Sequence, residues 1–105
     1  MTIFTERVIR AALSIPRGRV TTYGRIARAA GGGGMSARSV TGILGKAYDA
    51  GETRIPFHRI IYADGKVWVD DAHRAKRMKL YKEEGVMLDK GDRVKNFADI
   101  VFDFK

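Results

Sequence analysis

Four consecutive glycines, Gly31 to Gly34, restrict the fold of this chain more than any other feature of its sequence. A glycine inside a helix costs about 1 kcal/mol relative to alanine, because its backbone loses more conformational freedom on folding. The glycine run therefore ends one helix and separates it from the next. Apolar residues recur at helical spacing on both sides of the run, so two short helices joined by a glycine-containing turn are expected.

Three amphipathic helices are predicted in the first half of the chain. Their ranges are residues 3 to about 15, a short segment that Thr22 can cap and Gly31 ends, and Ser36 to about Tyr48. The inner stripe of the third helix is Val40, Ile43, Leu44 and Ala47. The second and third helices together are typical of a helix-turn-helix unit.

The outer face of the third predicted helix carries small residues, namely Thr41, Gly42 and Gly45. Two glycines weaken a helix, which suggests that something approaches the backbone closely on this side. A neighbouring helix of the same domain and a molecule bound from outside explain the pattern equally well.

The second half of the chain predicts a β-hairpin that would serve as a wing. Residues 59–62 and 66–69 flank Ala63-Asp64-Gly65, in which Asp-Gly favours a tight turn. The expected fold class is therefore mainly α, a small winged helix-turn-helix-like domain with a short β-hairpin. Residues 1–105 are expected to form this single domain.

A basic fourth helix is predicted after the hairpin. Asp70 or Asp71 can cap it and Gly85 ends it, with Ala75, Met78 and Tyr81 turned inward. The apolar residues of the tail, between residues 94 and 104, fit a helix or a strand, and the tail is expected to pack on the core.

The charge balance favours a polyanionic partner. The chain carries 20 Lys and Arg against 12 Asp and Glu, a net charge of +8, so nucleic acid is the first expectation and an anionic membrane surface the second. It lacks an apolar run that could span a bilayer, and a cytoplasmic monomer is expected. Cysteine is absent, which excludes disulfides and thiol nucleophiles.

Two residues are candidates for chemistry, and each has an ordinary alternative. Arg38 lies in the first turn of the third predicted helix, where a cation is disfavoured by the helix dipole. A bound anion or a stacked base would explain it, and so would a surface position. His58 could act as a base or could be a structural histidine. It has no paired ligand spacing with His73, so no metal or cofactor is expected.

Four motifs in order resemble the DNA-binding domain of O6-alkylguanine-DNA alkyltransferases. They are Ile15-Pro16-Arg17-Gly18-Arg19-Val20-Thr21-Thr22-Tyr23-Gly24-Arg25-Ile26-Ala27, Ser36-Ala37-Arg38-Ser39-Val40, Ile55-Pro56-Phe57-His58-Arg59-Ile60-Ile61 and Glu84-Gly85-Val86. In the active enzymes a Pro-Cys-His-Arg motif carries the cysteine that accepts the alkyl group, and here that position is Phe57. The chain therefore resembles the alkyltransferase-like proteins, which bind alkylated DNA without repairing it and hand the lesion to nucleotide excision repair.

The resemblance implies a role for individual residues. Arg38 matches the arginine finger that fills the gap left by a flipped nucleotide, and Tyr23 matches the tyrosine that helps to rotate that nucleotide. The implied DNA contacts are Thr22, Tyr23, Ser36, Ala37, Arg38, Thr41, Gly42 and Gly45. The implied lesion pocket comprises Tyr23, Phe57, His58, Arg59, Trp68 and Glu84. No catalytic residue is implied, because His58 and Glu84 would activate a thiol that is absent.

The chain also departs from the family pattern. Most alkyltransferase-like proteins carry tryptophan where this chain has Phe57, and residues 66–71 replace the glycine-rich pocket loop of the active enzymes. The segment between Arg38 and Phe57 is about two residues longer than is usual in the family.

Three functions remain open on the sequence. The leading one is a non-enzymatic protein that binds duplex DNA containing alkylated guanine, with nucleotide excision repair proteins as further partners. The second is a helix-turn-helix transcriptional regulator or general DNA-binding protein, although Thr41, Gly42 and Gly45 are poor readers of base edges. The third is a hydrolase that uses water activated by His58.

Overall fold

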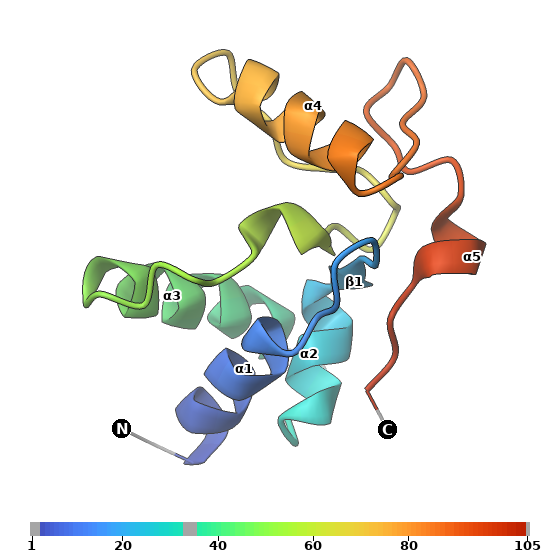
Figure 1. The fold of residues 1–105 in the computed structure, drawn as a ribbon. Coiled ribbons are helices and arrows are strands. Elements are labelled where there is room, and N and C mark those ends of the chain that lie inside the picture. The colour runs from blue at the N-terminus through green and yellow to red at the C-terminus, as the bar shows by residue number, and fades with distance from the viewer. Residues whose placement is uncertain (1–2, 33–35, 105) are drawn as a thin grey trace.

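The computed structural model describes residues 3–32 and 36–104 (Figure 1). In chain order the elements are α1 (Ile3–Leu13), β1 (Thr21–Thr22), α2 (Tyr23–Ala29), α3 (Ser36–Asp49), the 3-10 turn η1 (Phe57–Arg59), β2 (Ile60–Ile61), α4 (Arg74–Glu83) and α5 (Phe97–Ile100). No helix in this described part is long and apolar enough to cross a membrane.

Helices α1, α2 and α3 pack together around one apolar cluster at the base of Figure 1. Val8 and Ala12 of α1 meet Ile26 of α2 and the Val40–Leu44 pair of α3, and all five are buried. The three predicted helices are confirmed. The Thr22 hydroxyl accepts a hydrogen bond from the Arg25 backbone N–H at 3.2 Å, which is the predicted cap of α2. The cap predicted for the Ser36 side chain lies outside the described part of the structure.

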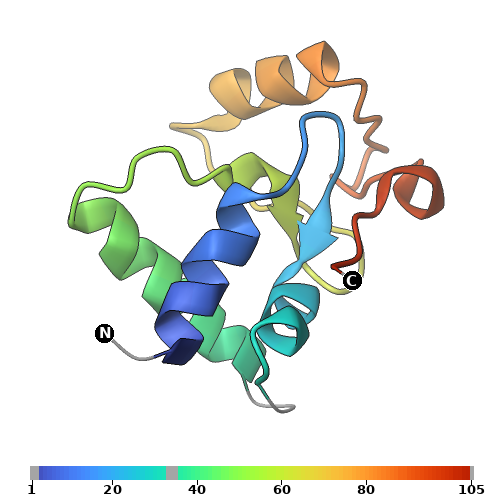
Figure 2. The ribbon, with the colours of Figure 1, turned by 60° about the horizontal axis from the view of Figure 1, so that its bottom comes forward.

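A two-stranded sheet joins the N-terminal helices to the rest of the chain. Strand β1 pairs with β2 in parallel, with Thr21 opposite Ile60 and Thr22 opposite Ile61 (Figure 2). Successive strand residues point to opposite faces, so Ile60 joins the helical cluster and Ile61 joins a second cluster. The second cluster consists of Val20, Ile61, Val67, Tyr81, Val86 and Val94. The sheet therefore holds the segment after Phe57 against the N-terminal helices.

The predicted hairpin is wrong in its pairing. The turn itself forms, since Gly65 has a φ of 86° and its N–H donates to the Tyr62 carbonyl at 2.9 Å. After it, however, Lys66 forms an antiparallel bridge with Arg93, and the Val67 N–H donates to the Asp92 carbonyl. The Tyr62 N–H donates to the Lys66 carbonyl at 3.0 Å, so the two arms of the predicted hairpin pair only next to the turn. Beyond it the backbone of Lys66 and Val67 pairs with the C-terminal segment, and the Val67 side chain is buried in the second cluster.

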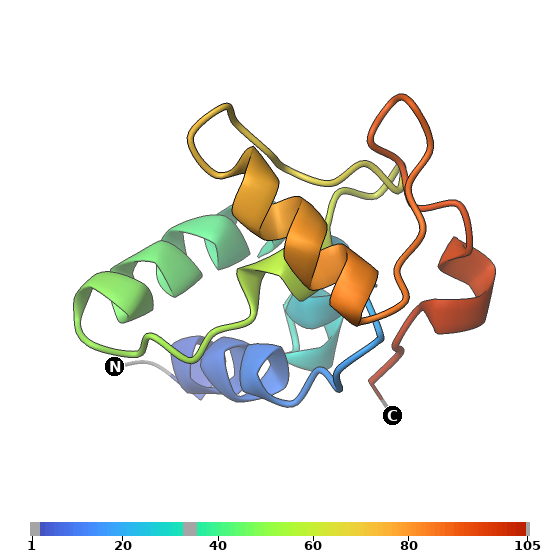
Figure 3. The ribbon, with the colours of Figure 1, turned by 45° about the horizontal axis from the view of Figure 1, so that its top comes forward.

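Helix α4 begins later than predicted. It starts at Arg74, because an Asp70 carboxylate oxygen accepts the His73 backbone N–H at 2.8 Å and closes a separate turn before the helix. Ala75 is exposed and not turned inward, whereas Tyr81 is buried as predicted and Met78 is half-buried. Figure 3 shows α4 lying across the segment that contains η1.

The C-terminal segment combines both predicted conformations. It forms the short helix α5 and then an extended stretch, in which Val101 bridges to Val20 and the Phe102 N–H donates to the Val20 carbonyl at 2.7 Å. The tail therefore packs on the core, as expected.

Candidate nucleic-acid interface

One side of α3 is open to solvent. We call this side, formed by Thr41, Gly42 and Gly45, the open face of α3. Thr41 and Gly42 are exposed, and a Cβ added at Gly42 or Gly45 would meet no described atom within 4 Å. Packing against a neighbouring helix of the domain, one of the two explanations for the glycines, is therefore contradicted within the described residues. The small side chains remain available for a partner from outside.

Arg38 stands at the N-terminal end of the same helix. Its side chain is exposed, and within the described residues it makes no hydrogen bond or ion pair. The N-terminus of a helix carries a partial positive charge, so the guanidinium gains nothing from its local surroundings. An unpaired cation beside a face of small residues is suited to a polyanion.

Gly45 provides a test that separates folding from binding. We expect Gly45→Ala to raise the free energy of unfolding by about 1 kcal/mol, because alanine favours the helix and the site is sterically open. The same variant should bind DNA more weakly, because the methyl group keeps the DNA backbone away from α3. Urea unfolding and duplex titration measure the two effects. A stabilised variant with unchanged DNA binding would contradict the close approach.

A cavity of about 380 Å³ opens beside the open face of α3. We call it the aromatic cavity; its lining residues are Tyr23, Thr41, Gly45, Tyr48, Asp49, Phe57, Ile60, Tyr62, Trp68 and Arg77. It brings together Tyr23, Phe57 and Trp68, which the sequence assigned to one pocket. Its size lies within the range of small-molecule sites, and one purine base with a substituent fits this range.

Aromatic rings surround this cavity. The Tyr23 and Tyr62 ring centroids lie 6.1 Å apart, and Tyr48 meets Phe57 edge to face at 5.8 Å. The Arg77 guanidinium carbon lies 5.5 Å from the centre of the Trp68 ring. Flat apolar walls of this kind suit a planar ring taken out of a base stack.

The sequence did not point to several residues that line the aromatic cavity. Tyr48 follows Thr41 and Gly45 at helical spacing, so it could have been predicted from the α3 pattern. Tyr62 and Arg77 reach the cavity only through the fold, since β2 ends just before Tyr62 and α4 crosses above η1.

The other three predicted pocket residues lie behind the aromatic cavity. His58 and Arg59 line a neighbouring cavity that shares Phe57 and Trp68, and Glu84 lines neither. The Glu84 side chain is only 4% exposed. Its carboxylate accepts hydrogen bonds from three groups: Arg59 Nε at 3.0 Å, the Gly18 N–H at 3.0 Å and His58 Nε2 at 2.7 Å. Glu84 thus fixes the turn that carries Phe57.

The protonation of this cluster follows from its hydrogen bonds. Burial alone would raise the pKa of Glu84, but the bonds from Arg59, Gly18 and His58 outweigh it and lower that pKa to about 2. Burial lowers the pKa of His58, and the Glu84 carboxylate only partly opposes this. His58 is therefore neutral at neutral pH and donates from Nε2 to Glu84, which holds it as a structural group.

Acid should destabilise the fold through these two residues. A histidine whose folded pKa is lowered contributes stability above its ordinary pKa of 6.5 and loses it as the pH falls. Glu84 stabilises the fold above its ordinary pKa of 4.5, and this stabilisation is lost as the pH falls toward its folded pKa of about 2. We therefore expect the free energy of unfolding, measured with urea, to decrease below pH 6.5 and more steeply below 4.5. A flat profile across both windows would contradict the described cluster.

Not all predicted DNA contacts lie at the surface. Thr22 is only 3% exposed and its hydroxyl caps α2, so its side chain is buried at the start of this helix. A DNA contact at Thr22 stays a prediction. Ala37 is half-buried at the start of α3, and the side chain of Ser36 lies outside the described part of the structure. No cluster of three or more metal-ligating side chains occurs among the described residues.

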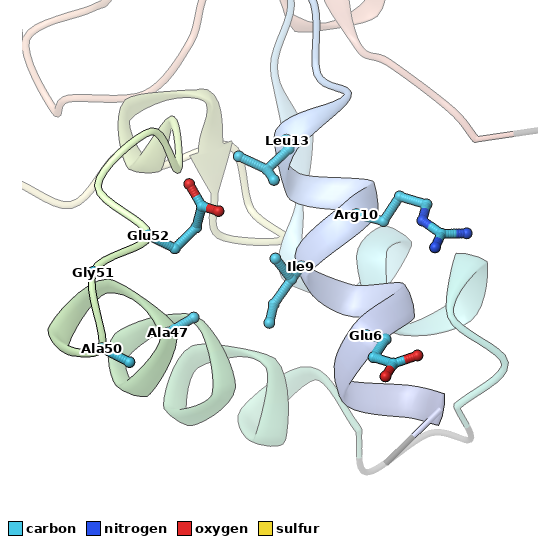
Figure 4. Close-up of a pocket in the computed structure, with 8 residues that line it drawn as sticks. All are labelled: Glu6, Ile9, Arg10, Leu13, Ala47, Ala50, Gly51 and Glu52. Carbon is cyan, nitrogen blue, oxygen red and sulfur yellow. The ribbon is translucent and has the colours of Figure 1, made fainter. Parts of the chain in front are cut away.

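A larger cavity, of about 620 Å³, lies between α1 and the C-terminal half of α3 (Figure 4). Ile9 and Leu13 point across it, whereas Arg10 points away. Glu6, Arg10 and Glu52 are its charged lining residues, so its net charge is negative, and Ala47 of the inner stripe forms one wall. Carboxylates repel phosphates, and none of the predicted pocket residues lies here. This cavity is therefore not part of the candidate interface.

The sequence profile of the 6-O-methylguanine DNA methyltransferase DNA-binding domain matches residues 3–86. The chain belongs to this family. The match includes the open face of α3 and every residue that lines the aromatic cavity. The family predicted from the four sequence motifs is therefore confirmed, and Phe57 stands within the matched region of this methyltransferase-type domain.

The domain is also similar in sequence to two curated proteins. It is 35% identical over 85 residues to the DNA base-flipping protein of Escherichia coli (strain K12). This match covers 81% of this chain and 64% of that protein. It is 35% identical over 88 residues to the methylated-DNA–protein-cysteine methyltransferase of Methanothermobacter thermautotrophicus, and this match covers 84% of this chain and 47% of that protein. The matched part of the chain thus spans less than two thirds of the length of these relatives.

Solved structures share the fold of the domain. S. pombe Atl1 bound to damaged DNA containing O6-carboxymethylguanine superposes with a TM-score of 0.78 at 30% identity, over 99% of this chain and 98% of that one. Mycobacterium tuberculosis OGT in complex with DNA gives a TM-score of 0.60 at 32% identity, over 80% of this chain and 50% of that one. The small, mainly helical fold predicted from the sequence is confirmed.

Proposed function

We propose that this domain binds duplex DNA along the open face of α3 and takes an O6-alkylguanine nucleotide into the aromatic cavity without transferring its alkyl group. Arg38 fills the gap in the base stack, and Tyr23 turns the nucleotide outward. The bound lesion is then marked for nucleotide excision repair. The domain acts as a single monomeric unit, and its small size and excess of positive charge suit this role.

One observation carries the proposal: Phe57, which the sequence resemblance assigns to the position of the alkyl-acceptor cysteine, lines a cavity that adjoins the open face of α3. A phenyl ring has no nucleophilic atom, so it can stack on or pack against a base but cannot accept an alkyl group. The DNA in the S. pombe Atl1 structure and the name of the E. coli base-flipping protein support the same mode of binding.

The two other functions fit the geometry less well. A regulator that reads sequence in the major groove needs side chains such as Asn, Gln or Arg along its recognition helix, and the open face of α3 offers Thr41 and two glycines. A hydrolase needs a base that faces the substrate, and the His58 ring is held by Glu84 outside the lining of the aromatic cavity.

Mass spectrometry tests the absence of alkyl transfer. We expect both the protein and the DNA to keep their masses after prolonged incubation with a duplex containing O6-methylguanine, because no cysteine is present to accept the methyl group. The M. tuberculosis O6-methylguanine methyltransferase serves as the positive control. A methyl adduct on the protein, or loss of the methyl group from the DNA, would contradict the proposal.

A further inference from the structure

Arg77 of α4 reaches the aromatic cavity from the side opposite α3. It is half-buried and lines both this cavity and its neighbour, with its guanidinium over the Trp68 ring. Among the described residues it forms no ion pair, in contrast to Arg59, Arg74 and Arg93. A partly desolvated cation without a counter-ion is electrostatically incomplete, and an anion in the cavity would complete it.

The charge of Arg77 acts on the interior of the site. Burial raises the pKa of Tyr23 and of Tyr81, and the Arg77 charge opposes that rise at both hydroxyls. The Tyr81 hydroxyl is buried and meets no described partner in good hydrogen-bond geometry, but the Arg77 side chain lies near enough to lower its pKa both by charge and as a hydrogen-bond donor. Arg77 and Tyr23 line the same cavity, so the charge of the guanidinium acts on the space where a flipped nucleotide would be held.

Resting on the proposed function, we infer that Arg77 makes the aromatic cavity favour O6-adducts that carry a negative charge over neutral adducts of similar size. A carboxylate on the O6 substituent would receive charge-assisted hydrogen bonds from the guanidinium. The contact with the Trp68 ring restricts the guanidinium, so less side-chain entropy is lost when the anion binds. A neutral alkyl group gains neither effect.

Asp49 is the acidic residue that lines the aromatic cavity and would oppose this preference. It lies at the exposed C-terminal end of α3, where water and salt screen its charge, whereas Arg77 is half-buried. The positive charge is therefore expected to dominate inside the cavity.

A second anion could also pair with Arg77, namely the phosphate of the flipped nucleotide. A phosphate contact would strengthen binding of every lesion equally, whereas a contact with the adduct would strengthen binding of charged adducts alone. The two sources of anion can be separated by comparing lesions in one duplex sequence.

The test uses three duplexes that differ only in the substituent on O6: methyl, propyl and carboxymethyl. Each is titrated at fixed salt with the full chain and with Arg77→Gln. We expect the full chain to bind the carboxymethyl duplex about five- to tenfold more tightly than the propyl duplex, and Arg77→Gln to bind the two equally. Lys79→Gln, which removes an exposed charge from the same helix, should keep the preference. Asp49→Asn should increase it.

The outcomes are distinct. If Arg77→Gln weakens all three duplexes by the same factor, the guanidinium contacts phosphate and the inference is wrong. If Arg77→Gln leaves the carboxymethyl preference intact, or the full chain has no such preference, the inference is also wrong while the proposed function stands. If the full chain binds none of the lesions better than an unmodified duplex, the proposed function itself fails.

Discussion

Replacing Arg38 by alanine is expected to weaken binding of an O6-methylguanine duplex about thirtyfold, while binding of unmodified duplex changes much less. Flipping a base costs a few kcal/mol of lost stacking, and a guanidinium that stacks in the gap offsets about 2 kcal/mol of that cost. Alanine cannot fill the gap. Arg38 is exposed and has no partner among the described residues, so the substitution is expected to leave the fold intact, which a melting curve checks.

Arg10→Ala is the matched control, because it removes one exposed arginine from α1 without touching α3. Both variants lose one positive charge, and if Arg38 acted by its charge alone, its loss would weaken the lesion duplex and the unmodified duplex by the same factor. Equal loss in the two variants, or lesion binding by Arg38→Ala as tight as that of the unchanged chain, would show that Arg38 is not the finger.

Glu84→Gln is expected to lower the free energy of unfolding by about 3 kcal/mol or more. Breaking a buried ion pair leaves an uncompensated charge, here the guanidinium of Arg59, which is only 20% exposed. The lowered pKa of Glu84, about 2 in the folded chain, indicates that its partners stabilise its ionised form. Urea unfolding of the two proteins at neutral pH measures the difference.

Glu83→Gln provides the control for this prediction. Glu83 is the neighbouring residue and is exposed, and its Oε1 lies 4.0 Å from Lys79 Nζ. Loss of the Glu83 charge should therefore change the free energy of unfolding by less than about 0.5 kcal/mol. If Glu84→Gln were as stable as Glu83→Gln, the cluster around Glu84 would not hold the turn that carries Phe57.

Local patterns in the sequence predicted the parts of the fold that depend on neighbours in the chain. The apolar stripe from Val40 to Ala47 predicted α3 and its open face, and Thr22 as a capping residue predicted the start of α2. The parallel pairing of Thr21 with Ile60 joins residues that are far apart in the chain, and no local signal encodes it. Asp-Gly predicted the turn at Gly65 correctly, but the pairing of Lys66 with Arg93 joins residues far apart in the chain and has no local signal.

The candidate site was predictable to a similar extent. Tyr23, Phe57 and Trp68 lie in one cavity, as the resemblance implied, because the β1–β2 pairing brings their segments together. His58 and Glu84 were assigned to the same pocket, yet their mutual hydrogen bond holds both behind it. Arg77 lies on a basic helix, where most charges simply face solvent, so only the crossing of α4 over η1 distinguishes it.

The measurement that tests the account most directly is a titration of the full chain onto two duplexes of the same sequence, one with O6-methylguanine and one with guanine. At fixed salt we predict clearly tighter binding of the lesion duplex, by about tenfold or more, because only a destabilised base pair gives up its guanine to the aromatic cavity at low cost. Equal affinity for the two duplexes would contradict lesion recognition and leave only general DNA binding.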